Sequence, residues 1–412
     1  MKGLNMKFLP VLLAIAVGSD VFASEALLRS RLDEVFAKSA AHYRALDAAA
    51  TPLMKDGKGE LQLPHTYYRG KRELNMQSVF WWTSGHFPGS LWYLYEATGD
   101  AFFRDRALAW TEIVRPNAKV TDNHDVGFIM NCSFGNARRL LKTDRYDALL
   151  VETADSLAKR FNDRLGLIRS WGALDETENF LVIPDNMMNL ELLVLASRIG
   201  GDGRFDKIAR SHADVTMRHH FREDGCSYHV LNYCQQDRRV KEIRRGQGAQ
   251  VGTAWSRGQS WGIYGYAMMH RETKNPAYLA FARKLADYAM RHPNMPADGI
   301  PYWDYGAPGE ERDSSAGAIM ASGLLDLAAS LPPAEAAPYR AFAVKQLLSL
   351  TSRDYFSEGD EIGHFLLKHG VGCKPGLIET GEGGDVDVPL VYGDYYFLEA
   401  LLRFANIVST NK

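Results

Sequence analysis

The sequence predicts an all-α protein, an (α/α)6 barrel, because two kinds of helical segment alternate along it. In the first kind, apolar residues recur at intervals of three and four beside a charged face, as in residues 146–162, 204–221 and 278–293. Six segments of the second kind are rich in small residues and apolar on nearly every side. A helix of the first kind touches solvent, whereas one of the second kind must be buried all round.

The six predicted inner helices share a polar or aromatic beginning, at Trp82, His124, Pro184, Ser256, Asp313 and Tyr392. Turn signals end three of them, at Thr98-Gly99-Asp100, Gly200-Gly201-Asp202 and Asn275-Pro276. Such a repeat of helical hairpins is buried most economically as a closed double ring, with six helices inside and six outside. An open solenoid is the alternative, but it requires capping faces that the sequence does not show. The polar beginnings are expected to converge at one end of the barrel.

Residues 1–23 are predicted to be a secretory signal peptide. Lys2 and Lys7 supply positive charge, and residues 8–18 form an apolar run too short to span a membrane. The small-residue pattern of Val21-Phe22-Ala23 places cleavage before Ser24, with a buried helix or an anchor as the alternative. Residues 24–412 are then expected to form one barrel domain, periplasmic or secreted, that does not contact a membrane.

Composition narrows the classes of partner. The chain has 412 residues, 46% hydrophobic and 24% charged, with a formal net charge of -2. These are ordinary globular values, so we expect no nucleic-acid surface, and a carboxylated ligand must be met by local arginines. The sequence does not indicate an oligomeric state.

Cofactor and metal motifs are not found in the sequence. No Gly-rich phosphate loop, His-x-x-x-His pair or Ser-His-Asp arrangement stands out, so no cofactor and no metal are expected. Cys132, Cys226, Cys234 and Cys373 match no zinc spacing. Cys226 and Cys234 could pair in an oxidising compartment, or all four could be small buried thiols.

Two aspartates begin neighbouring inner helices. Asp125 lies in the run from His124 to Phe128, and Asp185 lies in the run from Ile183 to Asn189. Facing each other across the barrel mouth, two carboxylates can share a proton, because the charge of one opposes ionisation of the other. The alternative for each is an N-cap, among the commonest roles of aspartate at the beginning of a helix.

Aromatic and polar residues surround these aspartates in the predicted mouth. Trp171, Trp255, Trp261 and Trp303 lie in Gly-rich or helix-starting segments, where their faces can hold sugar rings or belong to the core. Residues 246–262 place Gln247, Arg257 and Trp261 in a loop that leads into a buried helix. Arg257 there can clamp a carboxylate with two N–H groups.

Three further polar residues have two interpretations each. His229 either donates to a sugar hydroxyl or is a structural histidine. Asn186 and Asn189 either bind substrate or cap the helix that carries Asp185.

Seven motifs, taken together and in this order, resemble glycoside hydrolase family 88, the unsaturated glucuronyl hydrolases. The resemblance covers most of the mature chain and rests on Trp82-Thr83-Ser84-Gly85, His124-Asp125-Val126-Gly127-Phe128, Asp185-Asn186-Met187-Met188-Asn189, residues 255–262, Pro301-Tyr302-Trp303-Asp304-Tyr305, Asp313-Ser314-Ser315-Ala316 and Gly393-Asp394-Tyr395-Tyr396. It implies an (α/α)6 barrel, in agreement with the hairpin count.

The resemblance also implies roles for individual residues. Asp185 is similar to the family's general acid and base, and Asp125 to its partner, which contacts ring hydroxyls and keeps Asp185 protonated. The residues similar to those lining the unsaturated-sugar subsite are Trp82, His124, Trp171, His229, Gln247, Arg257 and Trp261. Ser84 stands where related sequences can carry an acidic residue, so it is left out of the catalytic set.

The implied substrate is an oligosaccharide whose terminal uronic acid carries the C4=C5 double bond left by a polysaccharide lyase. The implied reaction is hydration of this vinyl ether, in which an acid protonates C4, water adds at C5, and the hemiketal opens and releases the next sugar. Unsaturated rhamnogalacturonyl hydrolysis of pectin fragments is the alternative with the same chemistry. A glycosidase of saturated sugars and a non-catalytic glycan-binding barrel are the others.

The leaving sugar is expected to meet the loops around residues 228–245 and 368–387. The run Gly381-Glu382-Gly383-Gly384 predicts either a lid or a surface turn. A basic cluster there could meet a sulfate or could be a solvated loop, and consists of Arg238, Arg239, Lys241, Arg244 and Arg245.

Overall fold

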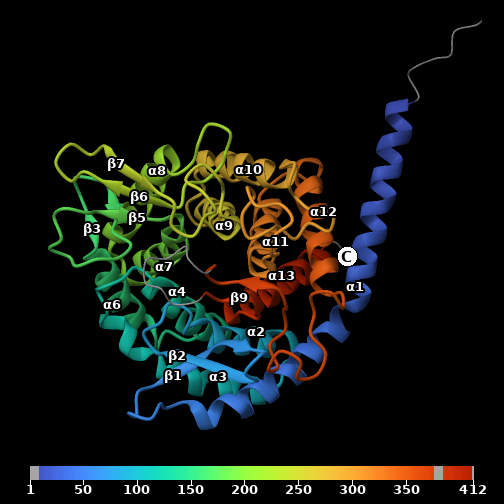
Figure 1. Cartoon of the computed structure of the whole chain (residues 1–412), viewed down its shortest axis with the longest axis horizontal. Coiled ribbons are helices and arrows are strands. Elements are labelled where there is room, and N and C mark those ends of the chain that lie inside the picture. The colour runs from blue at the N-terminus through green and yellow to red at the C-terminus, as the bar shows by residue number, and fades with distance from the viewer. Residues whose placement is uncertain (1–8, 375–383, 411–412) are drawn as a thin grey trace, which may run out of the picture.

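Helices of the inner ring surround a common axis, which Figure 1 views end on. The structure is a computed structural model that describes residues 9–374 and 384–410, and the side chains of residues 22–374 and 384–409. In chain order the ring consists of α2 (His86–Thr98), the broken segment α4 (Val126–Met130), η3 (Asn131–Gly135) and α5 (Asn136–Leu141), then η4 (Pro184–Asn189) with α7 (Leu190–Gly200), α9 (Ser256–Thr273), α11 (Ser314–Ala329) and α13 (Val391–Thr410). Helix α13 packs against α2 and closes the ring, so the (α/α)6 prediction is confirmed.

The outer ring is formed by helices that lead out of or into the inner ones. They are α1 (Leu9–Ala50), α3 (Ala101–Ile113), α6 (Asp147–Ala158), α8 (Gly203–His219), α10 (Pro276–Arg291) and α12 (Pro333–Leu350), with the short turns η1 (Thr51–Leu53) and η2 (Arg115–Lys119) between elements. Helix α1 packs on α2 and α12. Among the described residues, no helix is both long and apolar enough to cross a membrane.

Short antiparallel strands lie in the connections that lead to the inner helices. They are β1 (Gln62–Tyr68) with β2 (Glu73–Ser78), β3 (Phe161–Asn162) with β4 (Leu167–Ile168), the sheet of β5 (Leu181–Val182), β6 (Val230–Tyr233) and β7 (Val240–Arg244), and β8 (Gly370–Val371) with β9 (Val386–Val388). In the three-stranded sheet Val182 pairs with Leu231, and Leu231 with Ile243. A small apolar core under this sheet fixes the loops on that side of the mouth.

The predicted turns between hairpins are present and follow from local chemistry. Gly99 and Gly201 end inner helices in the left-handed region, at φ of 70° and 72°, where a residue without Cβ is not strained. Asp100 and Asp202 then cap α3 and α8, each accepting from a backbone N–H of its own helix. Asn275 caps α10 in the same way, ahead of Pro276.

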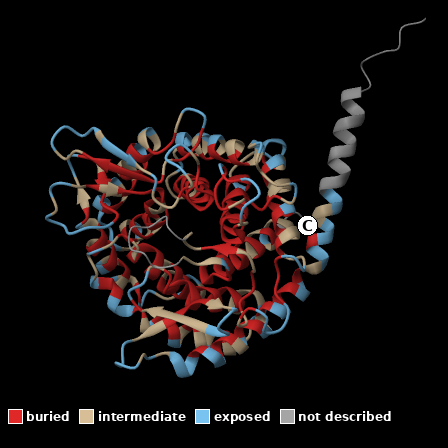
Figure 2. Ribbon diagram, viewed as in Figure 1, coloured by how far each residue is buried: buried red, intermediate tan, exposed pale blue. Residues whose placement is uncertain are grey.

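Small residues in the inner helices allow these helices to touch backbone to backbone. A Cβ at Gly323 would lie 2.9 Å from the Cα of Tyr264, and one at Gly127 would lie 2.6 Å from the Cα of Asn189. Both distances are shorter than real contacts, so the ring closes only with glycine there. Buried residues accordingly concentrate on the inner ring in Figure 2, as the all-round apolar pattern predicts.

Three inner helices begin or run differently from the prediction. The helix expected from Trp82 begins at His86, so Trp82 lies in the preceding turns. The segment after His124 is interrupted by the π-turn η3, whose released carbonyls are satisfied by side chains: Ser133 donates to Ile129 O, and Asn136 to Cys132 O. The segment from Pro184 opens as a 3-10 turn.

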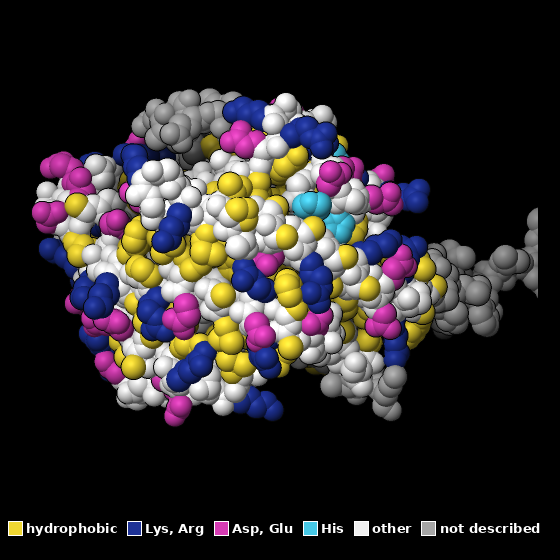
Figure 3. All heavy atoms as spheres, turned by 90° about the horizontal axis from the view of Figure 1, so that it is seen from below, with side chains coloured by type: hydrophobic (Ala, Val, Ile, Leu, Met, Phe, Trp, Pro, Cys, Tyr) yellow, Lys and Arg dark blue, Asp and Glu magenta, His cyan; other side chains and the backbone are white. Residues whose placement is uncertain are grey.

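Ion pairs bind the inner helices together at the end away from their polar beginnings. Arg403 of α13 contacts Asp326 of α11 at 3.3 Å and Glu399 at 3.3 Å. Arg271 of α9 pairs with the same Asp326 and with Glu191 of α7. The network borders a cavity of about 1030 Å³. On the outer face in Figure 3, basic and acidic side chains are interspersed, without a field of one sign.

Candidate active site

Asp125 and Asp185 begin neighbouring inner segments, and neither caps its helix. Asp125 is the residue before α4 and Asp185 is the second residue of η4, and no cap hydrogen bond is made at either helix end. Asp100 and Asp202, by contrast, bond to the N–H groups of the helices that they begin. Among the described residues, none hydrogen-bonds to the buried Oδ2 atom of Asp185. The capping alternative is therefore wrong for both aspartates.

Burial makes both carboxyl groups weaker acids than usual. It raises the pKa of Asp125 to about 7 against the opposing charge of Arg160. It also raises the pKa of Asp185 to about 6, although His124 and Arg257 act in the opposite direction. The charge of Asp125 adds only a smaller upward contribution at Asp185. The neighbouring carboxylate was expected to be the main cause, but removal from water is the larger one.

His124 links the two inner segments. Its Nδ1 lies 2.6 Å from Oδ1 of Asn186, and its Nε2 lies 3.4 Å from Oδ1 of Asp125. The Nδ2 of Asn186 donates to Ile168 O and to Ser170 Oγ, each at 3.0 Å. Burial lowers the pKa of His124 to about 4, so the ring is neutral near pH 7. Asn186 thus positions a histidine instead of capping a helix.

His229 approaches Asp185 from the loop before β6. Its Nε2 lies 3.9 Å from Oδ2 of Asp185, and its Nδ1 accepts from the backbone N–H of Gln247 at 2.7 Å. The ring packs on Trp255, with centroids 4.6 Å apart. Burial lowers its pKa to about 3, and the charge of Arg257 acts in the same direction. His229 is therefore neutral and directs a nitrogen toward the Asp185 carboxyl.

Arg257 differs from the free clamp that was expected. It lies in the first turn of α9, not in a loop, and its side chain is buried. Its Nη atoms donate to the carbonyl oxygens of Val371 and Gly372 and to Oε1 of Gln247, and Nη1 lies 3.6 Å from Asp313. Nε has no hydrogen-bond partner in the part of the chain that the structure describes. Arg257 therefore donates three of its five N–H groups to Val371, Gly372 and Gln247 and holds the 371–372 backbone at the mouth, so it is not a free clamp.

Two predicted tryptophans border the mouth. Trp82 packs on Tyr392, with ring centroids 4.7 Å apart. Trp171 is 39% exposed, and its centroid lies 6.5 Å from that of His124. A ring that is half covered on one face and open on the other offers a surface for a sugar ring.

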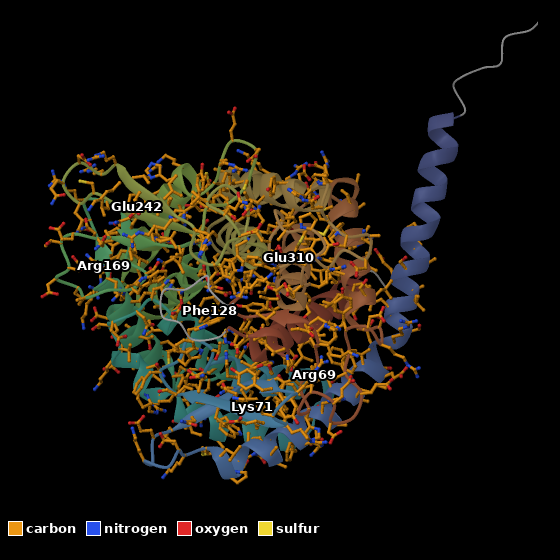
Figure 4. The ribbon with its side chains drawn as sticks, in the orientation of Figure 1. Arg69, Lys71, Phe128, Arg169, Glu242 and Glu310 are labelled. Atoms are coloured by element: carbon orange, nitrogen blue, oxygen red, sulfur yellow. The ribbon has the colours of Figure 1, made fainter. Side chains whose placement is uncertain are left out.

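Trp261 lies deeper than the other predicted residues. It is fully buried in α9 and packs on Phe128 and Tyr396, with centroids 5.2 and 5.3 Å away. Phe128 lies toward the centre of the ring in Figure 4. Trp261 therefore belongs to the packed centre of the barrel, although its Nε1 has no partner there.

The nine predicted residues thus form one connected cluster at the end where the inner helices begin. In and around this cluster, seven buried polar atoms have no hydrogen-bond partner among the described residues: Ser84 Oγ, Asp185 Oδ2, His229 Nε2, Arg257 Nε, Trp261 Nε1, Asp313 Oδ2 and Tyr392 Oη. Buried polar groups are nearly always satisfied, so this concentration indicates a place that a polar ligand or water fills. Over the described residues, no group of three His, Cys, Asp or Glu side chains is placed to hold a metal ion.

Comparison with known proteins identifies the family. No protein-family model matches the chain. Over 334 residues, 79% of this chain and 80% of the relative, it is 41% identical to an unsaturated glucuronyl hydrolase of Formosa agariphila. The chain belongs to the unsaturated glucuronyl hydrolase family. The resemblance to glycoside hydrolase family 88 is confirmed, and the chain is a glycosidase.

Other relatives of this unsaturated glucuronyl hydrolase family member differ in their named substrates. An unsaturated chondroitin disaccharide hydrolase of Streptococcus pyogenes serotype M1 is 34% identical, over 78% of this chain and 81% of its own. The crystal structure of an unsaturated glucuronyl hydrolase specific for heparin matches with a TM-score of 0.82 at 36% identity, covering 92% of this chain and 98% of that one.

Two sets of contacts at the mouth of the barrel were not predicted from the sequence. His65 of β1 bonds to Oδ2 of Asp385 at 2.9 Å, and Tyr68 donates to Oδ1 of Asp385 at 2.8 Å. These partners are more than 300 residues apart, so no local pattern could have linked them. Asp313 was noted only as a helix beginning, yet it caps α11 and faces Arg257. Its place in the motif Asp313-Ser314-Ser315-Ala316 was the one feature of the sequence that pointed to it.

The predicted basic cluster lies in the turn of the β6–β7 hairpin and along β7. Arg239 pairs with Asp237 at 2.8 Å and Arg244 with Glu242 at 2.7 Å, all on exposed side chains. Lys241 donates to a backbone carbonyl. These neighbouring acids offset part of the positive charge, which favours the solvated-loop interpretation over a sulfate site.

The remaining expectations concern cysteines and the Gly-rich run. Cys132, Cys226, Cys234 and Cys373 are free thiols, and Cys132 and Cys226 are buried. Cys132 and Cys226 agree with the buried-thiol interpretation, and Cys226 is not bonded to Cys234. The run Gly381-Glu382-Gly383 lies outside the described residues.

Proposed function

We propose that this family member removes the terminal Δ4,5-unsaturated uronic acid from glycosaminoglycan oligosaccharides that polysaccharide lyases produce. The names of its relatives support this substrate class. The observation that carries the proposal is the Asp185 carboxyl, whose Oδ2 is buried, unpaired and directed into a cluster of unsatisfied polar atoms. With a pKa of about 6, this group can hold a proton close to neutral pH and give it up to a bound substrate.

The proposed reaction begins at the double bond, not at the glycosidic carbon. Asp185 donates its proton to C4 of the vinyl ether, and positive charge develops at C5 and the ring oxygen. Water adds at C5 and loses a proton to the Asp185 carboxylate, which restores the acid. The resulting hemiketal opens, and the glycosidic bond then breaks to release the next sugar. Because nothing attacks C1, the two-carboxylate spacings of ordinary glycosidases do not apply.

The surrounding residues support this chemistry by position. In this proposal Asp125, on the adjacent segment, contacts ring hydroxyls of the substrate. Trp82 and Trp171 offer ring faces, and the unpaired Nε of Arg257 supplies positive charge for the uronate carboxylate. The remaining members of the proposed subsite are His124, His229, Gln247 and Trp261.

Loss of the absorbance of the C=C bond measures the reaction directly. We expect this absorbance to fall with unsaturated chondroitin, heparin or hyaluronan disaccharides, and saturated disaccharides to stay intact. Faster turnover of an unsaturated rhamnogalacturonan disaccharide than of all three would replace the proposed substrate with a pectin fragment. Binding without any absorbance loss on the whole panel would indicate a non-catalytic barrel.

A matched pair of variants tests the role of Asp185. Asp185→Asn removes the transferable proton with little change in shape, so turnover should fall by about 10²–10⁴-fold, the usual contribution of general acid catalysis. Asp202→Asn makes the same chemical change at the exposed cap of an outer helix and should keep wild-type turnover. Equal rates for both variants would show that another group is the acid.

The same proposal includes export and a single mature domain. Within the described side chains, the first buried residue is Leu28, and Phe22 and Ala23 are exposed, so neither of these two adds to the barrel core. Glu25 pairs with Arg340 of α12 and would remain in the mature chain. We expect the protein from a periplasmic or culture fraction to begin at Ser24, and mass spectrometry of its N-terminal peptide measures this. An intact N-terminus in that fraction would contradict the signal peptide.

A further inference from the structure

We infer that in the substrate-free site the proton of the carboxyl pair resides on Asp125, and that Asn186 is the positioning residue that keeps it there by selecting one tautomer of His124. The inference rests on the proposed function, because it concerns which acid is charged before substrate arrives. Asp185 must therefore gain the proton when substrate binds, and it remains the group that delivers it to C4.

The orientation of the Asn186 amide is determined by its partners. One of the two is the carbonyl oxygen of Ile168, which can only accept, so the atom 3.0 Å away must be the NH2 group. The other, Ser170 Oγ, also accepts from the backbone N–H of Ile183. The amide oxygen therefore faces Nδ1 of His124 at 2.6 Å, and Nδ1 must carry the hydrogen.

A neutral imidazole carries one N–H, so Nε2 of His124 presents a lone pair. That lone pair faces Oδ1 of Asp125 at 3.4 Å. A protonated Asp125 can donate toward it, whereas an ionised Asp125 would place negative charge against it. Among the described residues the Asp125 carboxyl makes no hydrogen bond that competes with this 3.4 Å contact, so the contact decides the favoured state.

His229 is held in the opposite tautomer. Its Nδ1 accepts from the backbone N–H of Gln247, so in the neutral ring the hydrogen is on Nε2. That N–H lies 3.9 Å from Oδ2 of Asp185 and favours the ionised carboxylate. The two histidines thus act on the two carboxyl groups in opposite directions.

Other charged groups around the pair do not reverse this order. Arg160 favours an ionised Asp125, and Arg257, itself beside Asp313, favours an ionised Asp185. His212 and His220 lie behind His124 and His229, and burial lowers the pKa of each, so both are neutral. Burial raises the pKa of both carboxyl groups, to about 7 for Asp125 and about 6 for Asp185, so the order of the two rests on the histidine contacts.

The histidine tautomers are directly observable by ¹⁵N NMR of protein labelled at histidine. At pH 7 we expect His124 to carry its hydrogen on Nδ1 and His229 on Nε2, with signals assigned from His124→Gln and His229→Gln variants. An Nε2–H tautomer or a doubly protonated His124 would overturn the inference. This spectrum requires no turnover, so its failure leaves the proposed function standing, and inactivity on every unsaturated substrate leaves the spectrum interpretable.

The location of the proton is observable by infrared spectroscopy of protonated carboxyl groups at pH 6.5. We expect Asp125→Asn to remove more of this absorption than Asp185→Asn does. Asp394, a buried carboxyl elsewhere with a pKa of about 7, contributes equally to both spectra and cancels. An equal loss in both variants, or a larger loss in Asp185→Asn, would contradict the assignment.

The role of Asn186 is tested against Asn189, its neighbour on the same segment. Asn186→Ala frees Nδ1 of His124, so we expect the Nε2–H tautomer and a fall of about one pH unit or more in the midpoint of the Asp125 carboxyl band. Asn189 accepts from the backbone N–H of Phe128 and does not contact His124. Asn189→Ala should lower the melting temperature and leave tautomer and band unchanged. If Asn186→Ala behaves in the same way, its role is structural and the inference fails.

Discussion

Asp125→Asn is expected to make the protein more stable, and only above acidic pH. In the folded chain burial raises the pKa of Asp125 from 3.8 to about 7, so its charge is disfavoured. The difference is about three pH units, which at 1.36 kcal/mol each is about 4 kcal/mol. Asparagine has no charge at any pH, and its NH2 can donate to Nε2 of His124 as the protonated acid does. The variant therefore keeps the contact and avoids the cost of ionisation.

The sign follows from proton binding in the two states. Between about pH 4 and 7 the unfolded chain has lost the Asp125 proton while the folded chain keeps it, so wild-type stability falls as pH rises through this window. Above about pH 7 both states are ionised and the whole difference of about 4 kcal/mol persists. The variant should match wild type near pH 4 and exceed it by about 4 kcal/mol at pH 8.

Urea unfolding at pH 4.5 and pH 8 measures this difference, and calorimetry gives a second reading. For a chain of this length about 4 kcal/mol corresponds to about 5 °C in melting temperature. The measurement at low pH is the internal control, since other effects of the substitution are present there too. A gain of equal size at both pH values, or a variant less stable at pH 8, would refute the reasoning that burial of a charge sets the pKa of Asp125.

Three other predictions concern the active site and the packing of the inner helices. First, because the acid must be protonated, kcat/KM should fall about tenfold per pH unit above the pKa of Asp185, about 6. The fall in kcat should begin at higher pH, because the bound uronate opposes ionisation of Asp185. Identical pH profiles for kcat and kcat/KM would contradict this. Second, Gly127→Ala forces a Cβ into the next inner segment and should cost roughly 1–3 kcal/mol in urea unfolding, whereas Gly203→Ala, with open space around it, should not. Third, Arg403→Met leaves Glu399 without its ion-pair partner and should destabilise the folded protein by roughly 3–5 kcal/mol with kcat unchanged. A lowered kcat under conditions where the variant is fully folded would link that end of the barrel to catalysis.

Much of the barrel is predictable because helix periodicity, caps and turns depend on neighbours in the chain. The Gly99-Asp100 and Gly201-Asp202 turns behave as their residue types require. The π-turn after Met130 was not foreseen, because it depends on side chains that happen to satisfy the carbonyls it releases.

The sequence indicated which side chains gather at the mouth better than it indicated what each of them contacts. All nine residues come together, yet Arg257 is occupied by carbonyl groups more than 110 residues away, and Trp261 lies in the packed centre. No spacing in the chain reveals such partners. The roles of the nine residues in catalysis stay predictions until variants are measured.

The sequence by itself determined where the helices lie, which of them are buried, and that two aspartates open adjacent inner segments. Only the tertiary structure decided that Asp125 and Asp185 are not caps and which groups face the ring nitrogens of His124 and His229. The physical reason is the distance along the chain over which the two kinds of interaction act. Helix formation is governed by residues three and four apart, whereas the acidity of a carboxyl group depends on removal from water and on donors brought from distant parts of the chain.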